Sequence, residues 1–210
     1  PIRLAKELIL NENPSGLLFV FNSDVICHYP LDKMVDFHKS HGGEGTIMVT
    51  EVEDPTKYGV VVADDSNKIE RFVEKPSVFI SNKINAGLYL FNTSVIDRIE
   101  NRPTSIEREI FPVMAKDQKI YQMILPGYWM DIGQPKDYLS GQTLHLSSLT
   151  TLDPASLAKG ENVTGNVLIH PTAVVDPTAQ VGPNVVLGEG CKIGAGSKVS
   201  NTTLLAGSSV

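Results

Sequence analysis

The stretch that decides the fold is LLFVFNSDVICH, residues 17–28. Its first five residues are an apolar run without polar alternation, which is typical of a strand that is buried on both faces in a parallel sheet. A polar Asn-Ser-Asp triplet follows and marks the carboxyl end of that strand. Ligands of open α/β sheets bind just beyond such ends. Asp24 is therefore either an oxygen ligand suited to Mg²⁺ or a cap of the next turn or helix.

Strands and helices alternate after this stretch. A helix is predicted over 31–41 and a second apolar strand over 46–52, so strand, helix and strand make a parallel βαβ unit with a right-handed crossover. Residues 59–63 and 68–73 are predicted to be strands that pair across a turn, and residues 83–92 a further strand. The first part of the chain is thus predicted to be an α/β domain.

Polar residues stand at the ends of these predicted strands. Glu74 and Lys75 end one strand, where a solvated strand end is the alternative interpretation. Asn85 begins the strand over 83–92, beside a glycine that indicates close approach of a ligand or another backbone. Asp131 is an isolated aspartate between apolar neighbours, and its alternative is a turn aspartate that bonds its own backbone.

Three other side chains are predicted to be structural. His38 and His41 are three residues apart on the predicted helix, and a helix surface is favoured over a metal pair because no third ligand is in sight. Residues 104–107, Thr-Ser-Ile-Glu, match a capping box, which gives Glu107 an adequate structural role. We therefore do not expect Glu107 in a site.

A six-residue period runs through the last fifty residues. Each repeat has an aliphatic residue and, four positions later, a mostly small one, which predicts hexapeptide repeats of a parallel β-helix with the aliphatic residues in its core. Cys191 takes a small position and is expected to be a buried, inert thiol. The predicted domains are 1–150 and 151–210. The aliphatic positions are Val163, Ile169, Val175, Val181, Leu187, Ile193, Val199 and Leu205.

Composition excludes several classes of protein. The net charge is −6 and no Lys/Arg cluster stands out, which argues against binding to nucleic acid or to an anionic membrane surface. There is no apolar run of about 18 residues that could span a bilayer. Two cysteines indicate no disulfide framework, and the cytoplasm is the default compartment. Because the chain starts at Pro1 and stops inside a repeat, we expect a fragment of a longer protein.

Five segments, in their order, resemble the sugar-1-phosphate nucleotidyltransferase family. The hexapeptide repeats fit this family too, and SIEREIFP (105–112) is particularly similar to the β-subunit type of its GDP-mannose-forming branch. The resemblance implies an incomplete Rossmann-like nucleotidyltransferase domain followed by a left-handed parallel β-helix. The five segments are FNSD (21–24), YG (58–59), FVEKP (72–76), NAGLYLFN (85–92) and GYWMDIGQPKDYL (127–139).

The resemblance implies that mannose 1-phosphate and GTP are joined to give GDP-mannose and pyrophosphate. It also implies that Asp24 and Asp131 bind the Mg²⁺ that bridges the nucleotide and the sugar phosphate. Phosphoryl chemistry needs positioning and charge neutralisation, and Mg²⁺ typically takes one or two carboxylates beside phosphate oxygens and water.

The same resemblance implies a set of sugar contacts. Glu74 resembles the family's acceptor of hydrogen bonds from sugar hydroxyls, and Lys75 resembles the point charge that pairs with the sugar phosphate. Gly59 and Asn85 correspond to further sugar contacts. The expected catalytic residues are Asp24, Lys75 and Asp131.

One departure from the family limits these expectations. The glycine-rich loop with its following arginine, and a later Lys-Pro element, are not found, so we expect the 210-residue chain alone to be inactive. Other nucleotide sugars, such as ADP- or UDP-glucose, and a non-catalytic regulatory or assembly subunit stay open as alternatives. The retained aspartates and the Glu-Lys-Pro element favour catalysis. A homo-oligomer, or a hetero-oligomer with a related subunit, is expected to form through the β-helix.

Overall fold

The computed structural model describes all residues, 1–210, and divides into two compact units, Pro1–Trp129 and Met130–Val210. None of the helices has the length and apolar character that a membrane crossing requires.

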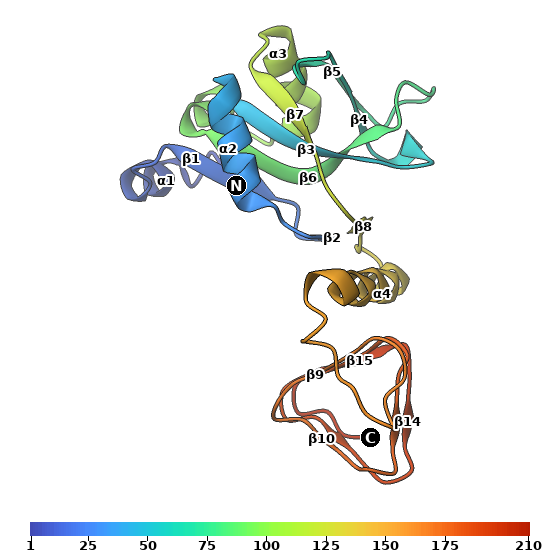
Figure 1. Cartoon of the computed structure of the whole chain (residues 1–210). Helices are drawn as coiled ribbons and strands as arrows, with labels where there is room; N and C mark the ends of the chain where they lie inside the picture. Colours follow the sequence, from blue (N-terminus) through green and yellow to red (C-terminus); the bar gives the residue numbers. More distant parts are fainter. The chain divides into compact units, whose positions relative to one another are not determined.

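The first unit is organised around one six-stranded sheet with β6 at its centre (Figure 1). β6 pairs with β3 along one edge, and on the other edge with β4 near its start and β1 near its end, always antiparallel. β5 extends the sheet beyond β4, and β7 runs parallel to β3 at the other side. The strands are β1 Leu17–Phe21, β3 Gly45–Glu51, β4 Gly59–Ala63, β5 Ile69–Glu74, β6 Lys83–Asn92 and β7 Ile120–Ile124.

Alternate residues of β6 supply two separate cores. Tyr89 and Phe91 pack with Phe111 of α3, whereas Leu88 and Leu90 belong to a cluster that includes Met34 of α2. Successive side chains of a strand point to opposite faces, so one buried strand carries both cores. The helices of this unit are α1 Lys6–Glu12, α2 Leu31–His41 and α3 Phe111–Lys116, with 3₁₀ turns at Pro55–Lys57 and Thr93–Arg98 and a π-helical turn at Ile106–Ile110.

β1 differs from its prediction. Leu17 to Val20 are only partly buried and Phe21 is 42% exposed, so the expectation of a strand buried on both faces was wrong. The reason is that β1 pairs with β6 alone, and its second edge has no partner strand. β1 and β3 are parallel to each other, as expected, but β6 lies between them. The predicted pair of strands at 59–63 and 68–73 is confirmed as β4 and β5.

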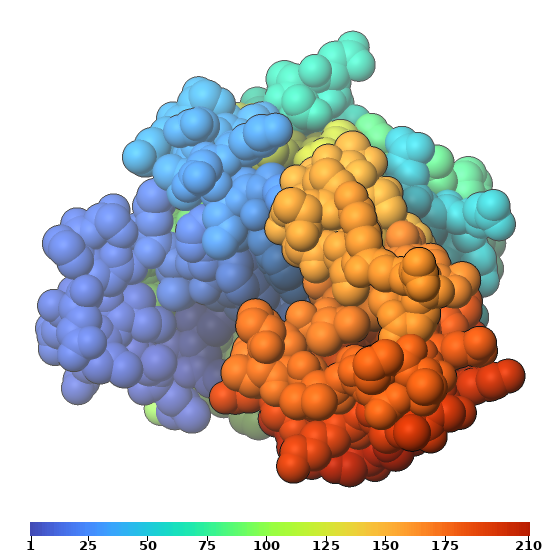
Figure 2. All heavy atoms as spheres, turned by 60° about the horizontal axis from the view of Figure 1, so that its bottom comes forward, coloured from blue at the N-terminus to red at the C-terminus, as the bar shows by residue number.

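Helix α1 lies at the surface of the first unit. None of its residues is buried, and Leu4 just before it is 80% exposed. Figure 2 shows the atoms of this segment, in violet-blue, at the surface. Arg3 and Lys6 both form ion pairs with Asp97, which lies in a 3₁₀ turn far along the chain.

The second unit contains α4, Pro135–Leu152, and a C-terminal coil of parallel strands with a triangular outline (Figure 1). Val174 pairs with Lys192, and Gln180 with Lys198, so partners are 18 residues apart (174 to 192). Cys191 is buried in the interior, as expected. The strands are β9 Val167–Ile169, β10 Val174–Val175, β11 Gln180–Val181, β12 Val185–Leu187, β13 Lys192–Ile193, β14 Lys198–Val199 and β15 Thr202–Leu204; β2 Val25–Cys27 and β8 Trp129–Asp131 lie before the coil.

The last predicted aliphatic position was wrong. Leu205 is 71% exposed, and Leu204 packs against the core of the coil in its place. Leu187 pairs with Leu204, one residue earlier than the regular spacing would give. The slip follows a tight corner at Asn201, whose φ of 47° is left-handed. One residue fewer at a corner moves every later side chain to the next position.

Helix α4 is bonded to the C-terminal coil within the second unit. The Gln142 side-chain amide donates to the carbonyl oxygens of Asn184 at 2.8 Å and Thr202 at 3.2 Å. The Thr203 hydroxyl donates to the Gln142 carbonyl oxygen. The compact units therefore divide before α4, whereas the sequence predicts a domain boundary after residue 150, and that boundary stays a prediction.

Candidate active site

Four of the six predicted site residues lie near one another on adjoining strands of the first unit. Gly59 begins β4 and pairs with Glu74, which ends β5 and precedes Lys75. Asn85 is close to the start of β6, where that strand meets β4. We call these four residues the open cluster. Strand pairing thus collects residues that the sequence separates widely.

Gly59 allows the Glu74 carboxylate and the Phe72 ring to lie close to the backbone of β4. A Cβ atom at this position would lie 2.9 Å from Glu74 Oε2 and 2.6 Å from Cζ of Phe72, and the Phe72 contact involves a buried ring. Heavy-atom contacts between carbon atoms are optimal near 3.5–4.0 Å. No larger residue fits here without displacing one of these side chains.

The Glu74 carboxylate is buried and incompletely bonded. Its side chain is 12% exposed, and Oε2 has no hydrogen-bond partner. Oε1 lies 3.8 Å from Nζ of Lys75, whose own side chain is 60% exposed. Burial, and then the charge of Glu107, raises the pKa of Glu74 above its ordinary value, against the opposing charges of Lys75 and Arg108. A buried acceptor without a partner is unfavourable unless something binds it.

Lys75 has an unusual backbone conformation. Its φ of 47° is left-handed, which is uncommon for a residue with a side chain. Its N–H donates to the carbonyl oxygen of Tyr58 at 3.0 Å, so the strand end is held in place. The strained backbone conformation therefore lies directly after the end of β5, at the residue that carries the ammonium group.

The Asn85 amide is fully engaged as a donor. Nδ2 donates to Glu107 Oε1 at 2.8 Å and to the Tyr89 hydroxyl at 2.7 Å. Oδ1 accepts from the Gly87 N–H at 3.0 Å. Only one lone pair on Oδ1 is left for a ligand, because an amide oxygen has two.

Glu107 was wrongly assigned to a capping box. Ser105 is the cap, and its Oγ accepts from the Arg108 N–H at 3.2 Å. Glu109 reaches back instead, where its Oε1 accepts from the Ser105 N–H at 2.9 Å. Glu107 is thereby free to bond Asn85. Both Glu107 and Glu109 follow Ser105 closely in the sequence. Since one of them is enough to bond the cap, this pattern indicated that the other has a different partner.

An aromatic pair that the sequence analysis missed borders the open cluster. The Trp129 indole N–H donates to the carbonyl oxygen of Ala86, next to Asn85, at 2.9 Å. Tyr58, next to Gly59, stacks edge-on against Trp129 with ring centroids 5.4 Å apart. These contacts brace the backbone on both sides of the cluster.

The two predicted metal ligands lie in different compact units. Asp24 is exposed in the turn between β1 and β2. Asp131 ends β8 and is partly buried, and its Oδ1 accepts from the Gly133 N–H at 2.9 Å, as the turn interpretation predicted. The second oxygen of Asp131 stays available. No group of three or more His, Cys, Asp and Glu side chains is arranged to hold a metal ion, and the joint role of the two aspartates stays a prediction.

The histidines of α2 form a network in which His38 is buried and His41 is partly buried, so the prediction of a helix surface was wrong. His38 is 3% exposed. The Gly43 N–H donates to His41 Nδ1 at 2.9 Å, and His41 Nε2 lies 2.8 Å from Oγ1 of Thr46. Thr46 Oγ1 also lies 2.8 Å from His38 Nδ1, and His38 Nε2 lies 3.2 Å from Asn92 Oδ1. We call these five residues the closed cluster.

One set of tautomers satisfies the whole closed cluster. Neutral His41 donates through Nε2 to Thr46, Thr46 donates to His38 Nδ1, and His38 donates through Nε2 to Asn92. Asn92 Nδ2 then donates to the Gly43 carbonyl oxygen at 3.0 Å. Burial, and then the charge of His38, lowers the pKa of His41 to about 4, and burial lowers the pKa of His38. The role of this cluster is structural.

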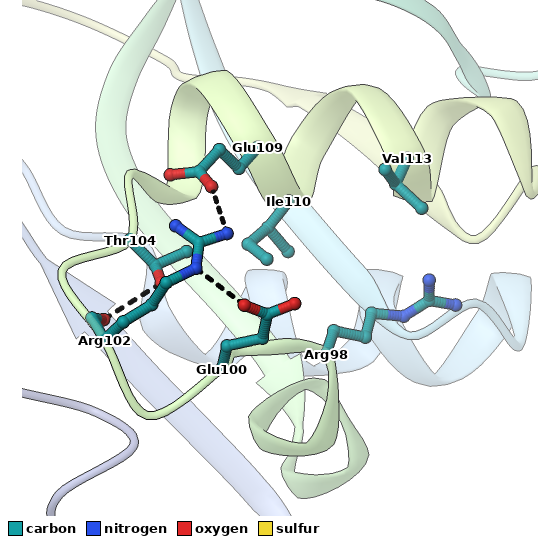
Figure 3. Close-up of a pocket in the computed structure, with 7 residues that line it drawn as sticks. All are labelled: Arg98, Glu100, Arg102, Thr104, Glu109, Ile110 and Val113. Atoms are coloured by element: carbon teal, nitrogen blue, oxygen red, sulfur yellow. Dashed lines mark hydrogen bonds and ion pairs between the residues drawn. The ribbon is translucent and has the colours of Figure 1, made fainter.

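A separate pocket of about 250 Å³ is lined by paired charges (Figure 3). The Arg102 guanidinium lies 2.6 Å from Glu100 and 2.7 Å from Glu109. Arg98 is bonded in the same way to Glu44 and Asp117, each at 2.7 Å. Since carboxylates already neutralise both arginines, the pocket has no free positive charge to attract an anion.

Comparisons with known proteins agree with this geometry. A sequence model described as Nucleotidyl transferase matches residues 1–148, and one described as GMPPB C-terminal domain matches residues 163–210. A mannose-1-phosphate guanyltransferase beta-B of Xenopus laevis is 57% identical over 83% of this chain and 48% of its own. A mannose-1-phosphate guanylyltransferase catalytic subunit beta of Dictyostelium discoideum is 55% identical over the same shares. The chain spans about half the length of these curated relatives.

Solved structures show the same fold. HddC from Yersinia pseudotuberculosis superimposes with a TM-score of 0.52 at 24% identity, over 67% of this chain and 58% of that one. HddC complexed with GMP-PN gives a TM-score of 0.51 at the same identity and coverage. The first unit has the Rossmann-like α/β fold of these proteins. Together with the match over residues 1–148, this shows that the chain belongs to the nucleotidyl transferase family.

Proposed function

We propose that the protein to which this chain belongs joins GTP and mannose 1-phosphate to give GDP-mannose and pyrophosphate. A phosphate oxygen of mannose 1-phosphate forms a bond to the α-phosphorus of GTP, and the bond from that phosphorus to the pyrophosphate group breaks. The names of the relatives from Xenopus laevis and Dictyostelium discoideum support this choice of substrates.

The observation that carries the proposal is the unpartnered, buried Oε2 of Glu74. It is an acceptor for a sugar hydroxyl, and Gly59 lets this carboxylate and the Phe72 ring lie close to the backbone of β4. The exposed ammonium of Lys75, beside it, pairs with the sugar phosphate. One acceptor and one cation at the same strand end match a hydroxylated phosphate ester.

We further propose that Asp24 and Asp131 hold Mg²⁺. Both residues fit this ion, because carboxylates are hard ligands and neither side chain is committed to an ion pair in this structure. When bound, Mg²⁺ neutralises phosphate charge during the transfer. Asp24→Asn and Asp131→Asn should each lower kcat about 10²-fold or more in the full-length protein, without loss of folding.

Two alternatives bear on the same site. Another nucleotide sugar, such as ADP- or UDP-glucose, would use the same sugar-phosphate contacts with a different base. A non-catalytic regulatory or assembly subunit would need no buried acceptor without a partner, so Glu74 favours an active enzyme. Comparing pyrophosphate release with GTP, ATP and UTP separates these possibilities.

The decisive test of the proposal is Lys75→Ala in the full-length protein. The KM for mannose 1-phosphate should rise tenfold or more, because a hydrogen bond to a charged group contributes roughly 1.5–3 kcal/mol. The KM for GTP should stay unchanged. Lys68→Ala, at the opposite end of β5, is the control and should change neither value. Equal losses for both substrates would assign Lys75 a structural role.

We also propose that the C-terminal coil is a left-handed parallel β-helix of hexapeptide repeats and the contact surface of an oligomer. The parallel pairing of residues 18 apart (180 to 198) and the subunit name of a relative support this. Ile193→Asp would bury an unpaired charge in the coil and should expose it to proteases and dissociate the assembly. Leu205→Asp is the matched control and should do neither. Equal resistance of both variants would refute the core assignment.

The cytoplasm is the compartment we propose. Cys27 and Cys191 are both buried free thiols, as is usual where disulfides do not persist.

A further inference from the structure

The orientation of the Asn85 amide is set by groups on both sides of it. Rotating the amide by 180° would turn Oδ1 toward the Glu107 carboxylate and Nδ2 toward the Gly87 N–H. The first contact would join two acceptors and the second two donors. Asn85 is 7% exposed, so water does not easily replace either bond. Glu107 and the Gly87 N–H therefore fix the orientation of the Asn85 amide together.

Glu107 comes from a different part of the chain than the strands of the open cluster. It lies in the π-helical turn Ile106–Ile110, which packs against β5. Its Oε1 accepts from Asn85 Nδ2 at 2.8 Å and lies 3.5 Å from the Tyr89 hydroxyl. Tyr89 is 2% exposed and is locked into an aromatic core with Phe91 and Phe111. The turn is thus attached to the back of the open cluster by one carboxylate.

Glu107 also acts on Glu74 through space. The groups that face Glu74 are Glu107 and Arg108 from the turn, Lys75 from its own strand end, and Tyr89 from β6. Of these, the negative charge of Glu107 opposes ionisation of Glu74. Glu107 therefore influences both acceptors of the cluster, one by a hydrogen bond and the other by its charge.

We propose that Glu107 is a positioning residue of the sugar subsite. Together with Tyr89 it occupies both hydrogens of the Asn85 amide, so that Asn85 and Glu74 meet the sugar as acceptors only. The acceptor positions of these two side chains that have no protein partner are Glu74 Oε2 and one lone pair of Asn85 Oδ1. Such a subsite recognises hydroxyl groups by the hydrogens they donate. This inference rests on the proposed function and names the polarity of its sugar site.

Substrate analogues test that polarity. Fluorine cannot donate a hydrogen bond, so replacing the recognised hydroxyl of mannose 1-phosphate with fluorine should weaken binding as much as removing it. We expect a loss of about tenfold in either case, the value of one typical hydrogen bond. If no fluoro analogue behaves like its deoxy counterpart, the subsite donates to the sugar and the inference is wrong.

Variants test the role of Glu107 in the full-length protein. Glu107→Ala should weaken mannose 1-phosphate binding about tenfold by calorimetry, because one Asn85 hydrogen loses its acceptor. Glu107→Gln keeps an acceptor oxygen and should restore binding to within about threefold of wild type. It should also lower the pKa of Glu74, followed by carbon-13 NMR of the side chain. Glu109→Gln is the matched control, since Glu109 bonds Ser105 and Arg102 instead, and should change neither readout.

The outcomes separate this inference from the proposed function. A wild-type protein that does not bind mannose 1-phosphate refutes the proposed function. The NMR signals of the Asn85 side-chain amide and of Glu74 still decide the positioning role in that case. A wild-type protein that binds, with Glu107→Ala binding equally well and both NMR signals unchanged, refutes the inference alone.

Discussion

Two buried polar clusters of the first unit differ in their hydrogen-bond balance. The side chains of the closed cluster form a continuous chain of hydrogen bonds that begins and ends at the Gly43 backbone. The chain runs through His41, Thr46, His38 and Asn92. In the open cluster, the last carboxylate oxygen has no partner. Both clusters include residues of the same sheet, so their difference is not one of fold.

This contrast indicates that the closed cluster stabilises the fold and that the open cluster binds a ligand. A buried polar group costs little when it is bonded, and leaving it unbonded costs roughly 1–3 kcal/mol. The closed cluster should therefore stabilise the fold and bind nothing. The open cluster should carry a stability cost that a ligand removes. Removing a bonded polar group from the closed cluster is therefore expected to destabilise the fold, whereas neutralising Glu74 in the open cluster is not.

The largest effect on stability is expected in the closed cluster. Thr46→Val keeps the side-chain shape but removes the hydroxyl that links the two histidines. The free energy of unfolding should fall by about 2–3 kcal/mol, because both ring nitrogens lose their partner. Denaturant unfolding measures this, with Thr50→Val on the same strand as the control. Mannose 1-phosphate binding should not change, and a large loss of binding would break the comparison.

The closed cluster should also make stability depend on pH. His41 has a pKa of about 4 in the folded protein and an ordinary value of 6.5. The unfolded chain therefore binds more protons between these values, so stability is fully present above about pH 6.5 and decreases as the pH falls toward 4. The slope is at most about 1.4 kcal/mol per pH unit for one proton. His41→Gln should show a shallower decrease in the same denaturant titration, and identical slopes would contradict the assignment.

A smaller loss is expected from filling the open cluster. Gly59→Ala places a methyl group against Phe72 and Glu74, at 2.6 and 2.9 Å before relaxation. Overpacking of this kind typically costs about 1–3 kcal/mol. Mannose 1-phosphate binding should be lost as well, since the methyl group displaces the Glu74 carboxylate. A variant that binds normally would show that the sugar lies elsewhere.

The smallest effect on stability, and the most informative, is expected for Glu74→Gln. It removes the repulsion between Glu74 and Glu107, so the free energy of unfolding should be unchanged or rise by up to about 1 kcal/mol. Binding of mannose 1-phosphate should nevertheless fall at least about tenfold. Glu70→Gln, an exposed residue on the same strand, should leave both unchanged. If Glu74→Gln were destabilising by several kcal/mol, the open cluster would be structural after all.

The positions of strands were predicted correctly from local sequence patterns, whereas the burial of a strand, which depends on long-range pairing, was not. The strands β4, β5 and β6 lie where turn residues and apolar runs predicted them. The burial of β1 was wrong because it depends on how many partner strands a run has, which its own residues do not encode. The predicted aliphatic positions pack in or against the core as far as Val199. After the tight corner at Asn201, Leu204 takes the place of Leu205.

The sequence by itself determined the strands of the six-stranded sheet, the spacing of the C-terminal aliphatic residues and the family, because periodicity and motifs are local or ordered along the chain. It also gave the candidate residues Asp24, Gly59, Glu74, Lys75, Asn85 and Asp131. Tertiary structure alone decided which carboxylate bonds Asn85 and which histidines are buried. Asn85 and Glu107 are 22 residues apart, and His38 and Asn92 are 54 apart. Such contacts depend on side-chain direction to within a few tenths of an ångström, and only the packed sheet sets that direction.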